Sequence, residues 1–177
     1  STLHTNSASG ALPRLVDMDI ETYLIASTIN LVVAQRLPRR ICKHCIEEYI
    51  ATPEIVKEIY HSLDNLSGLN VYDYAKASNP LAKEGKSELY DQIENDDIDN
   101  SEQLVLFRGG GCRECDGTGY KGRTGVFEVL KVTEKIGKMI VEGKSAADIE
   151  NQARADGMIT MKQDGYLKAL EGITTID

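Results

Sequence analysis

The stretches Cys42-Lys43-His44-Cys45 and Cys112-Arg113-Glu114-Cys115 contain every cysteine of this chain of 177 residues. Two thiolates at this spacing can bind one side of a metal ion, and two such pairs can complete a tetrahedral shell of sulfur around Zn²⁺. The interval between the pairs, residues 46–111, is longer than a compact zinc ribbon needs. The sequence therefore predicts one structural zinc site with Cys42, Cys45, Cys112 and Cys115 as its ligands.

Glycines surround the second cysteine pair, namely Gly109, Gly110, Gly111, Gly117, Gly119, Gly122 and Gly125. Tight turns with positive φ around a metal favour residues without a Cβ atom, so this density supports the zinc interpretation. Two disulfides or four ordinary buried cysteines are the competing interpretations. Disulfides need an oxidising compartment, and the sequence shows no secretory signal peptide.

The net charge of −8 is concentrated between the cysteine pairs. Residues 46–107 carry four basic and fourteen acidic side chains, residues 1–45 have a net charge of +2, and residues 108–177 are balanced. A basic stripe for phosphate binding is lacking, which argues against nucleic acid as the partner. The stretch 79–102, which includes Asp96-Asp97-Ile98-Asp99, is polar and is predicted to be a solvated loop, with an acidic docking surface as the alternative.

Apolar spacing predicts a first helix over residues 20–30. Asp19 would be its N-cap, and one face would carry Ile20, Tyr23, Leu24 and Ser27. No apolar run is long enough to span a bilayer.

Two segments with strand character bracket the cysteines. Leu31-Val32-Val33-Ala34-Gln35-Arg36-Leu37 is consistent with a buried strand or with a continued helix, and residues 124–132 are rich in β-branched side chains. Together they suggest a hairpin whose tip has been expanded into a zinc module. Inside the module, Pro53 is expected to open a short helix through His61, with Ile55, Val56 and Ile59 facing inward.

The C-terminal third predicts three helices that form a small bundle. Thr133 would cap the first, Ser145 with Asp148 the second, and Thr160 the third, and the terminating glycines are Gly143, Gly157 and Gly172.

A phosphate-binding loop of the Walker A type is absent from the sequence. Lys83-Glu84-Gly85-Lys86-Ser87 has Pro80 where the leading glycine belongs, and Gly143-Lys144-Ser145 has the wrong spacing from Gly137. No Walker B segment and no Ser-His-Asp signature follow either. The chain on its own is not a recognisable catalyst.

Several blocks of the sequence resemble the ATPases of type II secretion and type IV pilus assembly, in that family's order. They are Ser1-Thr2-Leu3-His4-Thr5-Asn6, which is similar to the family's His box, Gly10-Ala11, Arg14-Leu15, Met18, Leu24-Ile25-Ala26-Ser27, Ala34-Gln35-Arg36-Leu37, Gly111-Cys112 to Cys115, Gly117 to Glu128, Asp156 to Met161 and Asp164-Gly165. The resemblance covers about 115 residues, everything except 46–107.

This resemblance implies an α/β fold, the C-terminal fragment of a hexameric motor with a RecA-like P-loop ATPase core. Residues 1–41 would end the core, 42–119 would form the tetracysteine zinc module with an acidic insertion at 46–107, and 120–177 would hold the returning strand and a three-helix subdomain. Retraction-type relatives have a short turn in place of the module.

The family's Walker A, Asp box and Walker B precede the His box, so ATP and Mg²⁺ would bind only to a full-length protein, and this chain alone should be inactive. His4 would sense or orient the γ-phosphate in that intact motor. The implied partners are other subunits of the hexamer, an inner-membrane platform protein and further secretion or pilus components. The implied location is cytoplasmic, peripheral to the inner membrane.

Two features depart from the family's pattern. Ser7 replaces the acidic residue usual after the Asn, and the interval of 66 residues between the cysteine pairs exceeds the family's common span. A DnaJ-type chaperone repeat or a stand-alone interaction protein with a zinc-stabilised hairpin is the alternative, because Cys112-x-x-Cys115-x-Gly117-x-Gly119 also fits a DnaJ repeat. That fold uses four such repeats, whereas the first pair here lacks the glycines.

Overall fold

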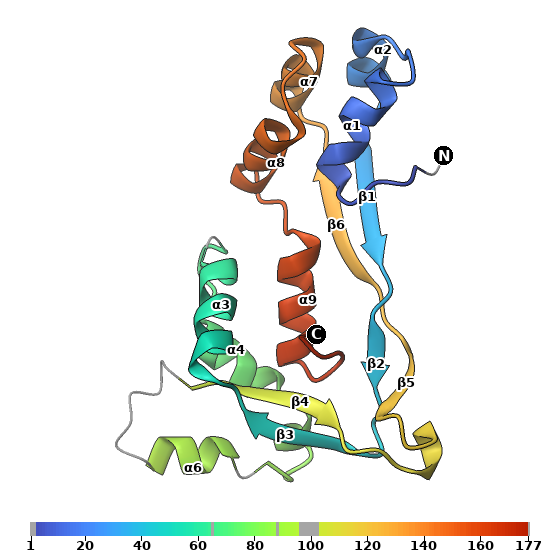
Figure 1. Cartoon of the computed structure of the whole chain (residues 1–177). Helices are drawn as coiled ribbons and strands as arrows, with labels where there is room; N and C mark the ends of the chain where they lie inside the picture. Colours follow the sequence, from blue (N-terminus) through green and yellow to red (C-terminus); the bar gives the residue numbers. More distant parts are fainter. Residues whose placement is uncertain (1–2, 65, 88, 96–102, 177) are drawn as a thin grey trace. The chain divides into compact units, whose positions relative to one another are not determined.

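The structure is a computed structural model, and it describes residues 3–64, 66–87, 89–95 and 103–176 (Figure 1). These residues pack into two units, each with its own apolar core. The described part of residues 1–36 joins residues 126–164 in the first unit. The second unit comprises the described parts of residues 37–125 and 165–177.

Helices and a two-stranded antiparallel sheet make up the first unit. Its complete elements are α1 (Ala8–Val16), α2 (Thr22–Thr28), β1 (Leu31–Arg36), β6 (Val126–Lys131), α7 (Glu134–Val141) and α8 (Ala146–Ala155). β1 pairs with β6 from Leu31 opposite Lys131 to Arg36 opposite Val126. The core gathers apolar residues of α1, α2, β6, α7 and α8.

In the described part of the second unit, four helices lie between two strands that precede them and two strands that follow them in the chain. Its elements are β2 (Arg39–Ile41), β3 (Ile46–Ile50), α3 (Pro53–Leu63), α4 (Val71–Ser78), α5 (Pro80–Lys83), α6 (Leu89–Asn95), β4 (Val105–Gly109), the 3₁₀ turn η2 (Arg113–Cys115) and β5 (Tyr120–Arg123). β2 pairs with β5 and β3 pairs with β4, both antiparallel. Helix α9 (Met161–Leu170) contributes residues 161–164 to the first unit and the rest to the second.

The prediction for the first helix was wrong at its start and in its buried face. α2 begins only at Thr22, because the chain makes a turn in which Asp19 takes a left-handed φ of 60° and the amide of Ile20 donates to the carbonyl of Leu15. Tyr23 is 61% exposed, whereas Ile25 is buried. The core uses the i, i+4 pair Ile25 and Ile29.

The segment after this helix is a strand, as one of the two interpretations predicted, but it is not buried on both faces. Val32 and Ala34 pack against the core of the first unit, whereas Leu31 and Val33 are each 52% exposed. The alternation follows from the period of two in a strand.

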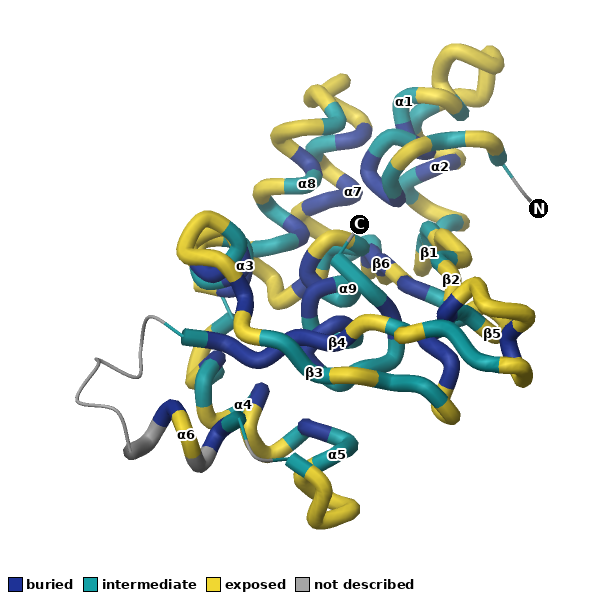
Figure 2. Tube along the Cα trace, turned by 60° about the horizontal axis from the view of Figure 1, so that its bottom comes forward, coloured by how far each residue is buried: buried dark blue, intermediate teal, exposed yellow. Residues whose placement is uncertain are grey.

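The prediction of a solvated loop over residues 79–102 was also wrong for the part of it that the structure describes. α5 and α6 lie in it (Figure 2). Tyr90 and Ile93 of α6 are buried with residues of α3, α4 and β4. Asn79 caps α5 by accepting hydrogen bonds from the amides of Leu81 and Ala82. The run Asp96-Asp97-Ile98-Asp99 lies outside the described residues. The acidic interval therefore holds much of the second core.

The three C-terminal helices and their caps are confirmed. Thr133 accepts from the amide of Ile136, Ser145 and Asp148 form a reciprocal capping box, and Thr160 accepts from the amide of Gln163. The helices nevertheless pack in two cores rather than in one bundle. α7 and α8 contribute to the first core, and the end of α9 contributes Tyr166 and Leu170 to the second.

The helix predicted after Pro53 is present as α3 and extends to Leu63, with Val56 and Ile59 buried as expected.

Candidate metal centre

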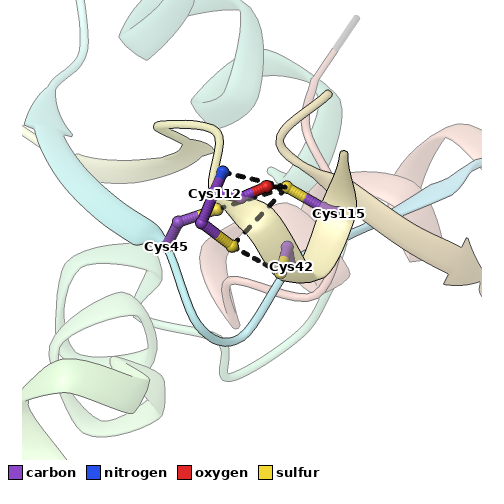
Figure 3. A group of neighbouring side chains, drawn as sticks. All are labelled: Cys42, Cys45, Cys112 and Cys115. Atoms are coloured by element: carbon purple, nitrogen blue, oxygen red, sulfur yellow. Dashed lines mark hydrogen bonds between the residues drawn. The ribbon is translucent and has the colours of Figure 1, made fainter. Parts of the chain in front are cut away.

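The four cysteines lie where strands of the second unit meet. The first pair joins the end of β2 to the start of β3, and the second pair lies between β4 and β5, with Cys115 in the 3₁₀ turn η2. Figure 3 shows the four side chains converging from these two turns. The pairing of β2 with β5 and of β3 with β4 thus brings cysteines 70 positions apart together.

The spacing of the four sulfur atoms matches a tetrahedral zinc site. All four Sγ atoms lie within 4.8 Å of one another. The Cys42–Cys112, Cys45–Cys115 and Cys112–Cys115 Sγ distances are 3.9, 3.8 and 3.7 Å. Zn–S bonds of about 2.3 Å in a tetrahedral shell place sulfurs about 3.8 Å apart. The donor set fits Zn²⁺, because four thiolates in this arrangement form a closed structural shell.

The structure does not support the interpretation of the four cysteines as two disulfides. All four cysteines are free, and the Sγ–Sγ distances are far above the bond length of about 2.0 Å in a disulfide. The interpretation as ordinary core cysteines is also disfavoured, since Cys45 and Cys112 are only half-buried. Convergence of all four sulfurs on one point is what a metal site requires.

Backbone contacts hold the two cysteine turns together. The amide of Cys42 donates to the carbonyl of Gly119 at 2.9 Å, and the amide of Gly110 donates to the carbonyl of Cys45 at 2.8 Å. The second turn closes through Gly117, which has a φ of +76° and donates to the carbonyl of Cys112. A residue with a Cβ atom is disfavoured in this conformation. The glycines therefore shape the turn that carries Cys115.

Backbone amides also set the protonation of the thiols. The amides of Cys112 and Gly119 each donate to the Sγ of Cys115 at 3.2 Å. The Cys112 amide is the main reason that the pKa of the Cys115 thiol falls to about 6. Burial, followed by contact with the neighbouring thiol of Cys112, raises the pKa of Cys45 to about 12. Burial likewise raises the pKa of Cys112. Cys115 is thus the first of these three to become a thiolate.

A cation lies next to the sulfur cluster. Lys121 pairs with Glu114 at 2.8 Å. The hydrogen bond to this carboxylate raises the pKa of Lys121, and its electrostatic interaction with Cys42 and Cys112 acts in the same direction. Four thiolates around a Zn²⁺ ion would carry a net charge of −2, which the positive side chain of Lys121 would partly offset.

His4 belongs to the first unit, whereas all four cysteines belong to the second. It lies in irregular chain before α1, and its side chain is exposed. Two residues on, Asn6 accepts a hydrogen bond from Arg36 of β1 at 2.9 Å. Ser7 is the N-cap of α1, and its Oγ accepts from the amide of Gly10 at 3.1 Å. Serine and aspartate are both strong N-caps, which explains how Ser7 can replace an acidic residue there.

Glu128 on β6 was not predicted as a functional residue, although its carboxylate is only 4% exposed. The signal was present in the strand's alternation. Val126, Glu128 and Leu130 share the buried face, so an acid stands between two core residues.

The serines of the two Gly-Lys-Ser sequences, Ser87 and Ser145, make structural hydrogen bonds. The Oγ of Ser145 caps α8, and the Oγ of Ser87 donates to Glu48 at 3.1 Å. Among the described residues, no helix combines the length and hydropathy that crossing a bilayer requires.

Comparison with known proteins agrees with the resemblance seen in the sequence. A family model described as Type II/IV secretion system protein matches residues 1–177. The type IV pilus assembly ATPase PilB of Thermus thermophilus is 36% identical over 177 residues, which are 100% of this chain and 16% of that protein. PilB of Pseudomonas aeruginosa is 33% identical over 178 residues, covering 100% of this chain and 25% of that protein.

Type II secretion system protein E of Dickeya dadantii is 33% identical over 175 residues, covering 99% of this chain and 27% of that protein. The chain thus spans only 16% to 27% of the length of these three relatives. Because the family model covers the whole chain, this protein belongs to the type II/IV secretion system protein family.

Proposed function

We propose that this chain is the C-terminal portion of a hexameric ATPase motor that drives type IV pilus assembly or type II secretion. The observation that carries the proposal is the family match over residues 1–177, together with relatives of both kinds at 33–36% identity. In this proposal residues 1–41 end the RecA-like core. Residues 42–119 form a zinc module at the tip of a hairpin, and residues 120–177 complete the fragment.

The module holds one structural Zn²⁺ through the two cysteine pairs. The Sγ spacings of 3.7 to 3.9 Å support this assignment, because they suit the tetrahedral shell of zinc. Structural zinc contributes roughly 10–16 kcal/mol of apparent binding energy in small peptides. That is enough to fasten the ends of the four short strands β2, β3, β4 and β5.

ATP and Mg²⁺ bind elsewhere in the longer protein, and the chain alone does not hydrolyse ATP. It lacks the amide cradle and the lysine that hold the β- and γ-phosphates. His4 contributes to turnover in the intact motor, where it acts at the γ-phosphate. Its exposed position before α1 leaves the imidazole accessible to a group outside this chain.

The partners of the motor are its own subunits, an inner-membrane platform protein and other components of the machinery, and nucleic acid is not among them. The motor is cytoplasmic and peripheral to the inner membrane. The DnaJ-type and stand-alone alternatives have less support, because the family match extends beyond the cysteines to both ends of the chain.

Zinc content tests the metal assignment. Protein purified without chelator should contain one zinc per chain by elemental analysis, and Cys112→Ser should lose it. Hydrogen exchange should then rise around the two cysteine turns while α7 and α8 stay protected, since they pack in the other core. Zinc-free wild-type protein would disprove the assignment.

ATP turnover of the intact protein tests the motor assignment. His4→Ala should lower kcat much more than the affinity for ATP, as expected of a group acting at the γ-phosphate. His61→Ala is the matched control, because His61 is an exposed histidine on α3 with no proposed role. Equal turnover in wild type and His4→Ala would remove His4 from the proposal, and an intact protein without ATPase activity would remove the motor.

A further inference from the structure

A buried carboxylate joins two helix starts in the first unit. Glu128 lies on the inward face of β6 and is 4% exposed. One oxygen, Oε1, accepts from the amide of Ala8 at 2.8 Å, at the first residue of α1. The other, Oε2, accepts from the amide of Met161 at 3.3 Å, at the first residue of α9. Each oxygen thus binds a different segment.

Backbone N–H groups satisfy both oxygens of the buried Glu128 carboxyl. A carboxylate buried without partners is strongly disfavoured, but each of its oxygens here receives a backbone N–H. Both amides lie at helix N-termini, where the helix dipole is positive. α1 has nine residues and α9 has ten. A reciprocal bond strengthens the second link, because the amide of Phe127 donates to Asp164 of α9 at 2.8 Å.

The contact at Ala8 fixes the chain that carries His4. Only residues 5–7 separate them. Within this short segment Asn6 accepts from Arg36 of β1, and just beyond Ala8 the hydroxyl of Ser9 donates to Glu150 of α8 at 3.3 Å. Of the three contacts, only that of Ala8 with Glu128 is fully buried. Backbone at Ala8 cannot shift without breaking it.

We infer that Glu128 is a positioning residue for His4: its carboxylate holds the start of α1 against β6 and α9, and so sets the place of the imidazole in ATP hydrolysis. Glu128 does not touch the nucleotide in this account and acts only through the segment 4–8. The inference rests on the proposed function, since it assumes that His4 contributes to turnover. A displacement of about 1 Å at a reacting group can cost about a hundredfold in rate.

The test uses the intact ATPase with Glu128→Gln. The amide can accept only one of the two N–H bonds and presents its own N–H₂ to the other donor. We expect kcat to fall about 10- to 100-fold, with the KM for ATP within about twofold. Glu150→Gln is the matched control, because it neutralises a more exposed carboxylate that contacts Ser9, the residue after Ala8. It should change kcat much less.

A double variant separates positioning from a general structural role. If Glu128 acts through His4, Glu128→Gln should have no further effect on kcat in a His4→Ala background. A purely structural defect would lower kcat by the same factor in both backgrounds and would overturn the inference. Full turnover in His4→Ala would instead disprove the proposed role of His4, so the two failures are distinguishable.

Hydrogen exchange gives a readout that does not depend on activity. The amide of Ala8 should exchange faster in Glu128→Gln than in the wild type, and it should stay protected in Glu150→Gln. Glu128→Asp, which keeps the charge and both acceptors on a shorter arm, should give intermediate exchange and intermediate kcat. It also serves as the test variant if Glu128→Gln does not fold. Unchanged exchange at Ala8 would contradict the inference.

Discussion

Gly109 and Gly119 pass so close to each other that a β-carbon at Gly109 would lie 2.0 Å from the carbonyl oxygen of Gly119. One residue ends β4, and the other lies between the second cysteine pair and β5. The carbonyl of Gly119 also accepts from the amide of Cys42. The meeting of these two backbones therefore brings the cysteine turns within reach of one metal.

Replacing Gly109 by alanine should push the backbones at Gly109 and Gly119 apart. The added methyl meets backbone rather than a flexible side chain, so we expect the free energy of unfolding to fall by about 1–3 kcal/mol or more. Zinc should pass to a chelator faster from the Gly109→Ala variant than from the wild type. Gly137→Ala, in α7, is the control. Its added Cβ atom would lie 3.8 Å from the Cβ atom of Ala26, which is an ordinary van der Waals distance. That change should be neutral or stabilising by up to about 1 kcal/mol. Equal zinc release from both variants would contradict the explanation.

Zinc binding should release protons and weaken as the pH falls. The pKa of Cys45, about 12, and the raised pKa of Cys112 keep these thiols protonated at pH 7 in the metal-free protein. Cys115, with a pKa of about 6, is already mostly a thiolate there. Zinc must displace the remaining protons, so its apparent affinity should drop between pH 8 and pH 6.

Calorimetry of zinc binding at pH 7 in two buffers of different ionisation enthalpy should measure this release. Heats that do not depend on the buffer would show that the thiols had lost their protons before the metal arrived.

Ser7 should behave as a helix cap that an aspartate can replace. Ser7→Ala removes the acceptor for the amide of Gly10 and should cost about 1 kcal/mol of stability. Ser7→Asp should retain most of it, because aspartate caps helices about as well as serine. Ser27→Ala, in the last turn of α2, should be near neutral. Denaturation midpoints of the three variants measure the differences, and a Ser7→Ala protein as stable as the wild type would show that the cap contributes nothing.

Truncating Ile93 tests whether the acidic interval is part of a folded core. Ile93 is 1% exposed, so Ile93→Ala should lower the free energy of unfolding by about 2–5 kcal/mol. Lys83→Ala, at an exposed position on α5, should change it by less than about 0.5 kcal/mol. If both variants have the same free energy of unfolding as the wild type, the described part of residues 79–95 does not stabilise the core.

Local patterns predicted the features that depend on a few neighbouring residues. The Cys-x-x-Cys spacing identified the four sulfurs that converge, and the caps at Thr133 and Ser145 located α7 and α8. These signals are specific because a pair of ligands or a cap acts within three or four positions of the chain.

Composition gave a wrong prediction where a few apolar residues determine how a mostly polar segment packs. The sequence of α6 is mostly polar, yet Tyr90 and Ile93 are buried in the second core and Leu89 packs against it. The face of α2 was predicted wrongly for a similar reason, because the packing of α2 against α7 selects the face with Ile25. Choices of this kind depend on partners far away in sequence, which periodicity does not report.

Long-range contacts of single polar groups were equally invisible. Glu128 belongs to a strand that the sequence predicts, but its two hydrogen-bond partners are 120 and 33 positions away. The strand's alternation places this acid on the face of Val126 and Leu130, but without the fold its two partners cannot be identified.

The chain leaves the β2–β5 ribbon after Ile41 and returns to it at Tyr120, the residue paired with Ile41 across the ribbon. Everything between these positions, including the metal centre, begins and ends at neighbouring points. In evolution, a segment with adjoining ends can be acquired, enlarged or lost in a single genetic event while the flanking strands stay in register. The β1–β6 pairing lies outside this segment, so a change in the segment's length leaves the residues of that pairing untouched.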